Sequence, residues 1–163
     1  MPEFTHLDAE GRVRMVDVTE KAPTPRTAVA QGVVTMTPET FHKIRQRTVK
    51  KGNVLETARI AGIMAAKKTA DLIPMCHPLN LTHVAVKFFP DPATHAIKIQ
   101  ATARILDRTG VEMEALTAVA GAALTIYDMC KSHDREMTIS DICLVEKTGG
   151  KSGHFIRSSA TAG

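Results

Sequence analysis

The chain of 163 residues contains no tryptophan, only one tyrosine, and 4% aromatic residues in all. Its basic residues form no run longer than the pairs Lys50-Lys51 and Lys67-Lys68. Proteins that hold nucleic acids usually need aromatic stacking platforms or long cationic stripes, and the sequence provides neither. We therefore expect no nucleic-acid partner.

Cysteine is scarce as well, since Cys76, Cys130 and Cys143 stand in unrelated contexts without C-x-x-C spacing. This pattern predicts neither a disulfide framework nor a structural zinc site. The first residues lack the basic and apolar regions of a secretory signal. The longest apolar segment, 115–127, is interrupted by threonines and is shorter than the roughly 20 residues that cross a bilayer. We expect a cytoplasmic protein without a membrane partner, in which this segment is a buried helix.

The residues that are present suit one globular domain, with 44% hydrophobic and 23% charged residues. The 21 Lys and Arg exceed the 17 Asp and Glu, and this small surplus suits an anionic small molecule. Three prolines make 1–25 an extended N-terminal arm, 26–150 carries the domain, and 151–163 reads as a flexible tail.

Periodicity and turn residues predict alternating strands and helices along the chain. Thr37-Pro38-Glu39 and Asn53 with Glu56 are helix-start signals, and Thr109 with Glu112 has the spacing of a capping box. This order of elements is that of an α+β, ferredoxin-like split βαβ fold, an antiparallel sheet with helices packed on one face. The expected elements are a strand over 26–36, helices over 37–47 and 53–70, a hairpin of strands over 84–88 and 97–105, a helix over 109–131 and a strand over 137–147.

The segment 73–78 is predicted to be a stiff loop, because each of its prolines disfavours helical geometry in the preceding residue. Its His77 could act as a general acid or base, or could simply cap a backbone carbonyl. Cys76 is more consistent with a buried thiol than with a nucleophile.

The long helix begins with Glu112, Met113 and Glu114 and ends near Asp128 and Lys131. Asp128 and Lys131 share one helix face, either as part of a site or as an exposed salt bridge. Glu114 and Asp128 lie about 21 Å apart along the helix, too far to contact one small substrate. A site that uses both would be shared between two subunits, with an antiparallel helix pairing as the commonest kind of interface. Four small residues of this helix would allow that close approach: Ala118, Gly121, Ala122 and Ala123.

Further cations that could contact an anion are Arg26, Lys51 and Lys147. The glycine-rich segment 147–153 lacks the spacing of a Walker motif. It could still present a cationic loop to an anion, or be a solvated tail.

At these residues the sequence resembles the cyclic pyranopterin monophosphate synthase family (MoaC). The resemblance spans about residues 5 to 155. It is carried by stretches that occur in family order: Met15-Val16-Asp17-Val18-Thr19, 57–63, Asp71-Leu72-Ile73-Pro74-Met75-Cys76-His77-Pro78, 109–117, 122–131 and Gly149-Gly150-Lys151-Ser152-Gly153.

The resemblance implies a ferredoxin-like subunit in a homohexamer, a trimer of dimers with sites at the dimer interface. It also implies the conversion of (8S)-3′,8-cyclo-7,8-dihydroguanosine 5′-triphosphate, a GTP derivative, into cyclic pyranopterin monophosphate and pyrophosphate during molybdenum cofactor biosynthesis. No tightly bound cofactor or metal is expected, although Mg²⁺ could arrive with the triphosphate.

The resemblance also implies roles for individual residues. It makes Asp128 the catalytic acid or base and Lys131 its partner. Lys51 and His77 are further catalytic candidates, and the substrate-binding candidates are Met75, Cys76, His77, Glu112, Met113, Glu114, Arg26 and Lys147.

Two other functions are weighed against this one. A ferredoxin-like nucleotide-binding regulator would need the cations but not the acid and base groups Asp128, Lys131 and His77. A metallohydrolase would need ligand spacing such as H-E-x-x-H, which is absent from the sequence.

Overall fold

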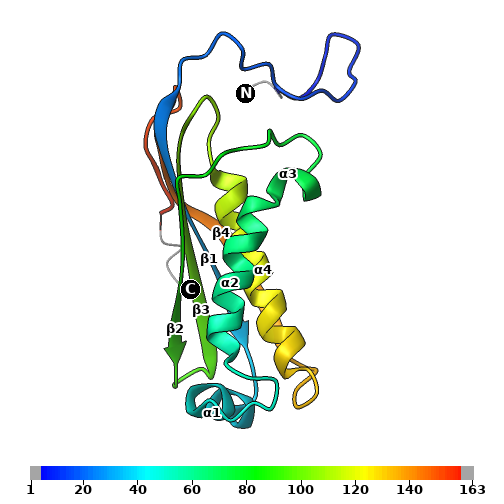
Figure 1. Cartoon of the computed structure of the whole chain (residues 1–163), viewed down its shortest axis with the longest axis vertical. Coiled ribbons are helices and arrows are strands. Elements are labelled where there is room, and N and C mark those ends of the chain that lie inside the picture. The colour runs from blue at the N-terminus through cyan, green and yellow to red at the C-terminus, as the bar shows by residue number, and fades with distance from the viewer. Residues whose placement is uncertain (1–4, 159–163) are drawn as a thin grey trace.

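The structure is a computed structural model that describes residues 5–158. Five strands and four helices follow one another along the described chain (Figure 1). In chain order they are β1 (Thr24–Thr35), α1 (Pro38–Gln46), α2 (Val54–Lys67), α3 (Thr69–Leu72), β2 (His83–Asp91), β3 (Ala96–Asp107), α4 (Glu112–Cys130), β4 (Thr138–Thr148) and β5 (Phe155–Ile156).

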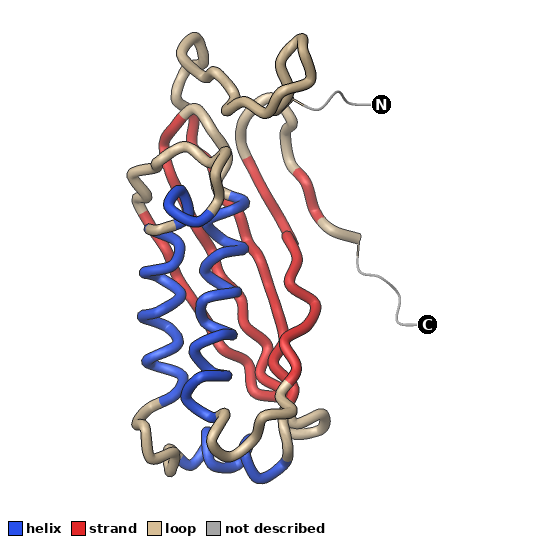
Figure 2. The backbone as a smooth tube through the Cα atoms, turned by 90° about the vertical axis from the view of Figure 1, so that its right-hand side faces the viewer, coloured by secondary structure: helices blue, strands red, loops and turns tan. Residues whose placement is uncertain are grey.

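The strands form one sheet in the order β2-β3-β1-β4-β5, and every neighbouring pair is antiparallel. The helices α2 and α4 lie side by side over the same face of this sheet (Figures 1 and 2). This confirms the predicted α+β class with helices on one face. The order of the first four strands is compatible with the ferredoxin-like split βαβ arrangement.

Most predicted elements form where the local signals placed them. Thr37 caps α1 and accepts a hydrogen bond from the Thr40 backbone, while Asn53 caps α2 and accepts one from Glu56 N at 3.2 Å. The helix expected to run through residue 70 ends at Lys67, and the short α3 follows. The two-residue β5 pairs with β4 inside the segment 151–163, where the sequence predicted no strand.

The capping box predicted at Thr109 is wrong. The helix α4 begins at Glu112, its N-cap is Val111, and no side chain caps it. The Glu112 carboxylate instead pairs with Lys147 of β4 at 2.6 Å. The spacing of Thr109 and Glu112 assigns the Glu112 carboxylate to the helix end. In the structure this carboxylate instead binds Lys147, on a strand far along the chain.

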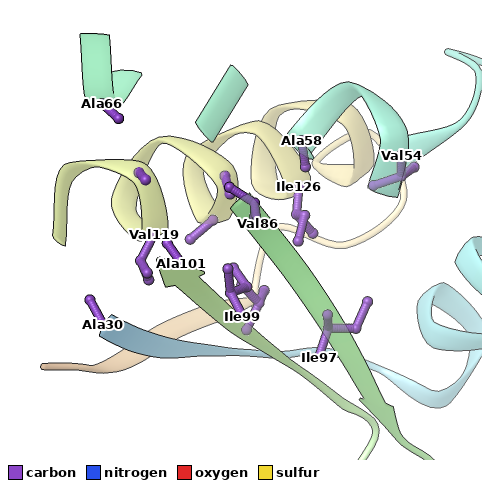
Figure 3. Close-up of a cluster of buried hydrophobic side chains, with 14 of the residues drawn as sticks. Ala30, Val54, Ala58, Ala66, Val86, Ile97, Ile99, Ala101, Val119 and Ile126 are labelled. Atoms are coloured by element: carbon purple, nitrogen blue, oxygen red, sulfur yellow. The ribbon is translucent and has the colours of Figure 1, made fainter. Parts of the chain in front are cut away.

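The core lies between the sheet and the layer of α2 and α4. Figure 3 shows Val119 and Ile126 on the side of α4 that faces the sheet, where Ile97 and Ile99 of β3 lie, and all four side chains are fully buried. Burial of an aliphatic side chain contributes about 1.5 to 3 kcal/mol, so this layer is a main source of the free energy of folding.

The small residues of α4 do not serve the purpose that the sequence suggested. Ala118, Ala122 and Ala123 are buried within the subunit, and Gly121 lies against Ala65 of α2. A methyl group on Gly62 of α2 would likewise approach the Ala118 carbonyl at 2.9 Å. The expectation that these residues let a second copy approach is therefore wrong. Ala118, Gly121 and Ala122 lie where α2 and α4 pack closely within one chain.

No helix in the described part of the chain is long and apolar enough to cross a membrane.

Candidate functional site

A cavity of about 390 Å³ opens at the N-terminal end of α4. It brings together the loop after α3, the start of α4, the start of β1 and the N-terminal arm. Seven of the predicted site residues line it: Arg26, Met75, Cys76, His77, Glu112, Met113 and Glu114. Residues from four separate segments thus meet in one place, as the substrate-binding prediction requires.

The loop before β2 holds His77 half-buried against the N-terminal arm. His77 Nε2 lies 2.8 Å from the carbonyl oxygen of Val16, so this nitrogen carries a proton and donates to the arm. The carbonyl-capping alternative considered for this histidine is therefore present in the structure. The same contact makes the arm one wall of the cavity, because Val16 and Val18 line it too.

Glu112 lines the cavity and forms an ion pair with Lys147, the predicted binding residue that does not itself line the cavity. Their side chains are 27% and 20% exposed, so the pair is only partly screened by water. A Cβ atom at position 110 would collide with the Glu112 carboxylate, so Gly110 leaves room for it to fold back toward β4. The pair fixes the start of α4 to β4.

Glu114 is buried, with 3% of its surface exposed, yet it lines the cavity. Burial raises the pKa of Glu114 to about 7, and the neighbouring Glu112 carboxylate adds to the rise. Burial also raises the pKa of the Cys76 thiol, so this cysteine is not activated as a nucleophile. A carboxyl group that titrates near neutral pH can either donate or accept a proton in the cavity.

Arg26 enters the cavity from β1 with a fixed orientation. Its Nε and Nη2 atoms donate to the carbonyl oxygens of Asp107 and Arg108, each at 3.1 Å. Gly149 and Gly150 both have positive φ angles, and a Cβ atom on Gly150 would collide with the guanidinium group. Because Gly149 and Gly150 have no side chains, the Arg26 side chain has room to lie at this position.

The opposite end of α4 carries a second cluster of predicted residues, Lys51, Asp128 and Lys131. Lys131 Nζ lies 2.6 Å from Asp128 Oδ1, and Lys51 Nζ lies 3.6 Å from Asp128 Oδ2. Lys51 also donates to the Asp128 carbonyl oxygen at 2.8 Å. The hydrogen bond from Lys131 and the charges of both lysines lower the pKa of Asp128. The side chain of Asp128 is 60% exposed, so within one chain this cluster is an exposed ion-pair network.

The two clusters lie at opposite ends of the molecule (Figure 1). The structure joins Arg26, Lys147 and the residues of the loop and helix start, and it separates them from the lysine–aspartate cluster. The spacing between Glu114 and Asp128 within α4, about 21 Å, is therefore preserved in the fold.

Two cations of the cavity were missed by the sequence interpretation, Lys21 and Arg108. Arg108 Nε donates to the Lys21 carbonyl oxygen at 2.9 Å, which ties the arm to the end of β3. The only local signal was the position of Arg108 directly before the Thr109-Gly110 turn. Lys21 had none, because it lies in the segment interpreted as an arm.

Among the described residues, no group of three or more His, Cys, Asp or Glu side chains could hold a metal ion. Glu112 already pairs with Lys147, and Asp128 with two lysines. The carboxylates of Glu112 and Asp128 thus face cationic groups in this structure.

The fold and the first cluster define a class of protein. It is an α+β protein in which acid, base and cationic side chains surround a cavity suited to an anionic small molecule.

The chain belongs to the MoaC family, whose profile matches residues 15–150. It is 68% identical over 156 residues to a protein of Desulforapulum autotrophicum, with 96% of both chains covered. It is 63% identical to one of Desulfatibacillum aliphaticivorans, covering 96% of this chain and 98% of the relative. Both relatives bear the name cyclic pyranopterin monophosphate synthase.

A third relative, from Chloroflexus aurantiacus, is 60% identical over 155 residues and has the same name, with 95% of each chain covered. The family assignment made from the sequence motifs is confirmed.

Proposed function

We infer that this chain is a lyase that converts (8S)-3′,8-cyclo-7,8-dihydroguanosine 5′-triphosphate into cyclic pyranopterin monophosphate and pyrophosphate in molybdenum cofactor biosynthesis. The observation that carries this conclusion is 68% identity over 96% of the chain to a relative with that name. The cavity agrees with it, because the reaction needs proton transfers and stabilisation of a departing anion, and acid, base and cationic groups line the cavity.

Each cluster has its own proposed role. His77, Glu112, Glu114 and Arg26 bind and orient the substrate at the N-terminal end of α4. There His77 and Glu114, whose pKa is about 7, can exchange protons with the purine-derived ring of the substrate. Asp128, with Lys131 and Lys51, supplies the second set of acid and base groups. Support comes from the short contacts of Asp128 with both lysines, which hold three titratable groups within reach of one another.

The two clusters meet if the active site lies between two subunits. We propose that the chain forms a homohexamer, a trimer of dimers, in which the N-terminal end of α4 from one copy faces the C-terminal end from its partner. The outer surface of the helix layer supports such a contact. Ile60 and Met64, one turn apart on α2, are 63% and 49% exposed, and Leu124 of α4 is 61% exposed.

This arrangement also accounts for the exposure of Asp128. A catalytic carboxylate in open solvent interacts weakly with its partners, because water screens the charges. A partner subunit over the cluster would exclude water and strengthen the ion pairs.

We propose that Mg²⁺ takes part as a counter-ion of the triphosphate substrate and that the protein itself holds no resident metal. Such an ion keeps several waters and binds mainly through substrate phosphates. We also propose a cytoplasmic location, which fits the free thiols of Cys76, Cys130 and Cys143.

The test of the function is pyrophosphate release by the purified protein on addition of the cyclised substrate. The product is identified in parallel by its mass. Asp128→Ala serves as the matched inactive control, since the exposed carboxylate contributes little to folding. Binding of substrate without release of pyrophosphate would contradict the lyase function and favour a nucleotide-binding regulator. A loss of activity with a chelator that only Mg²⁺ in excess over substrate restores would indicate a resident metal instead of a counter-ion.

A further inference from the structure

A separate cavity of about 260 Å³ lies at the end of the molecule where α1 is found, between α1, the start of α2 and the last part of β2 (Figure 1). It shares no lining residue with the cavity at the N-terminal end of α4, nor with the lysine–aspartate cluster. Three arginines line it, Arg45, Arg47 and Arg59, against the single carboxylate of Glu56. We call it the arginine cavity, and the proposed function uses none of these residues.

Arg59 is already engaged within the chain. Its Nη2 atom pairs with Glu56 Oε1 at 3.0 Å, and its Nη1 atom donates to a backbone carbonyl oxygen of β2. Its guanidinium carbon lies 5.3 Å from the centre of the Phe88 ring, which is the geometry of a cation–π contact. Arg59 therefore holds Phe88 in place, as part of an apolar wall that also includes Leu55 and Pro90.

Arg45 and Arg47 differ from Arg59, because both are exposed and neither takes part in an ion pair within the described part of the chain. The nearby carboxylate of Glu39 pairs with Lys43 at 2.9 Å. A guanidinium group is planar and offers two parallel hydrogen bonds to the oxygens of a phosphate group. Two such groups at one small cavity therefore suit a phosphate group.

The backbone at Arg47 gives a second reason to look for a ligand. Its φ angle is 58°, in the left-handed region, and it ends α1. The Arg47 and Thr48 amides donate to the carbonyl oxygens of Ile44 and Lys43 at 3.1 and 3.0 Å, a helix-ending turn that usually has glycine at this position. An arginine is strained in this conformation. The turn itself therefore does not account for the arginine, whereas binding by its side chain does.

From these observations we infer that the arginine cavity is a second binding site, for a small organic monophosphate. The phosphate group lies between Arg45 and Arg47, and the organic part lies against the apolar wall. A mostly apolar wall with a few convergent polar groups is the usual composition of a small-molecule site. Asn53 also lines the cavity, and it belongs to the loop that carries Lys51, so the ligand contacts a segment shared with a catalytic candidate.

The experiment is a calorimetric titration of the full-length protein with phenyl phosphate, which joins one phosphate group to one small aromatic ring. Inorganic phosphate and phenol are titrated in parallel. We expect phenyl phosphate to bind more tightly than either, because only this probe uses both the arginines and the apolar wall. Equal affinity for inorganic phosphate would contradict a site for an organic phosphate and leave only a site for the free anion.

The variant that tests the site is Arg47→Gly. Glycine suits the left-handed conformation, so this change removes the side chain and should keep or raise the resistance to denaturant. Weaker binding by Arg47→Gly then cannot come from loss of the fold. We expect it to bind phenyl phosphate about tenfold more weakly, the usual effect of losing a charge-assisted contact. Arg45→Ala should act in the same direction.

Arg104→Ala is the matched control, because Arg104 is an exposed arginine on β3 that does not line the arginine cavity. Its affinity should equal that of the unchanged chain. Arg26→Ala is titrated as well, since Arg26 lines the cavity at the N-terminal end of α4 and could bind the same probe there.

Three results would overturn the inference. They are no measurable binding of phenyl phosphate, equal affinity of the unchanged chain and Arg47→Gly, and loss of binding in Arg26→Ala without loss in Arg47→Gly. The last result would place the probe in the other cavity. Because the titration involves no turnover, each of these results leaves the proposed lyase function standing.

Discussion

The two ends of α4 differ in how far a single chain buries the charged side chains there. At the N-terminal end, Glu114 is 3% exposed, Glu112 pairs with Lys147, and the arm and a loop cover the cavity. At the C-terminal end, Asp128 and Lys131 form an ion pair of the same length, 2.6 Å, but both side chains are more than half exposed. One end is an enclosed cavity, while the other has charged groups that nothing in a single chain covers. The proposed second copy would account for this difference.

The largest effect that can test this comparison comes from Lys131→Ala. If the exposed cluster is catalytic, loss of Lys131 should lower kcat by about 10² to 10⁴, the usual contribution of a positioned acid or base. Folding and assembly should be unchanged, because surface substitutions away from structural contacts cost little. Circular dichroism and light scattering verify both, and pyrophosphate release measures activity.

At this end, Lys50 provides a matched control for its neighbour Lys51. Lys51 contacts Asp128, whereas Lys50 has no such contact and is exposed. Lys51→Ala should resemble Lys131→Ala, and Lys50→Ala should resemble the unchanged chain. Full activity of either Lys131→Ala or Lys51→Ala would remove that lysine from the catalytic set.

Mixing defective chains tests directly whether the two ends form one site. Mixed dimers of Glu114→Ala and Asp128→Ala should contain one site with both defects and one with neither. We therefore expect about half the activity of unchanged dimers, because each dimer has two sites. The chains are co-expressed with different tags, and the mixed species is isolated by two affinity steps.

A control pair with both defects at the same end sharpens this result. Dimers of Glu114→Ala with Glu112→Gln should show no rescue, because every site then carries one defect. Rescue in the control pair, or none in the verified Glu114→Ala and Asp128→Ala dimers, would mean that the two ends do not share a site.

A change on the outer face of α4 tests the proposed contact itself. Leu124→Glu places a charge at a side chain that is 61% exposed in one chain, so the subunit should still fold. If a partner covers this face, dimers should dissociate and activity should fall with them. Leu106→Glu is the control, because Leu106 is equally exposed at 61% but lies on the sheet. Light scattering that finds two-fold pairs intact in Leu124→Glu would exclude this face as the dimer contact.

How far the sequence predicts these features depends on the range of the interaction. The starts of α1 and α2 were predicted correctly, because Thr37 and Asn53 act on backbone groups three residues away. The capping box at Thr109 failed because Glu112 pairs with Lys147, which lies on a strand after the whole length of α4.

The candidate site shows the same limit. The sequence motifs named residues that the fold gathers into two clusters, and Glu114 and Asp128 lie in one helix, as the predicted separation assumed. Lys21 was missed because nothing local distinguishes a cation in an extended arm from a solvated one. The small residues of α4 were assigned to a subunit contact, since the sequence does not say which neighbour lies against Gly121.

Between about pH 4.5 and 7, the buried end should show a pH dependence of stability that the exposed end lacks. The pKa of Glu114 is raised to about 7 in the folded chain from an ordinary value of 4.5. Between these values the folded state keeps a proton that the unfolded state releases, so the free energy of unfolding falls as pH rises through this window. The loss is on the order of 3 kcal/mol.

Denaturant unfolding at several pH values between 4.5 and 7 measures this slope. Glu114→Gln mimics the protonated carboxyl group and should flatten it. The lowered pKa of Asp128 acts in the opposite direction, and only at more acidic pH. A slope that survives in Glu114→Gln would assign the pH dependence to other groups.

The smallest expected effect compares the two ion pairs. Glu112 and Lys147 are 27% and 20% exposed, whereas Asp128 and Lys131 are 60% and 51% exposed. Lys147→Met keeps the length of the side chain but leaves a half-buried carboxylate unpaired, which should lower the free energy of unfolding by about 1 to 2 kcal/mol. Lys131→Met should cause no measurable change, because exposed ion pairs contribute little.

Chemical denaturation at low salt and at about 1 M salt, where the screening length falls to about 3 Å, separates the two cases. The double variant Glu112→Gln with Lys147→Met should cost less than the sum of its single changes, since it leaves no unpaired charge. Equal destabilisation by Lys147→Met and Lys131→Met in a protein verified to be dissociated into single chains would mean that the two ends of α4 do not differ in burial as the structure describes.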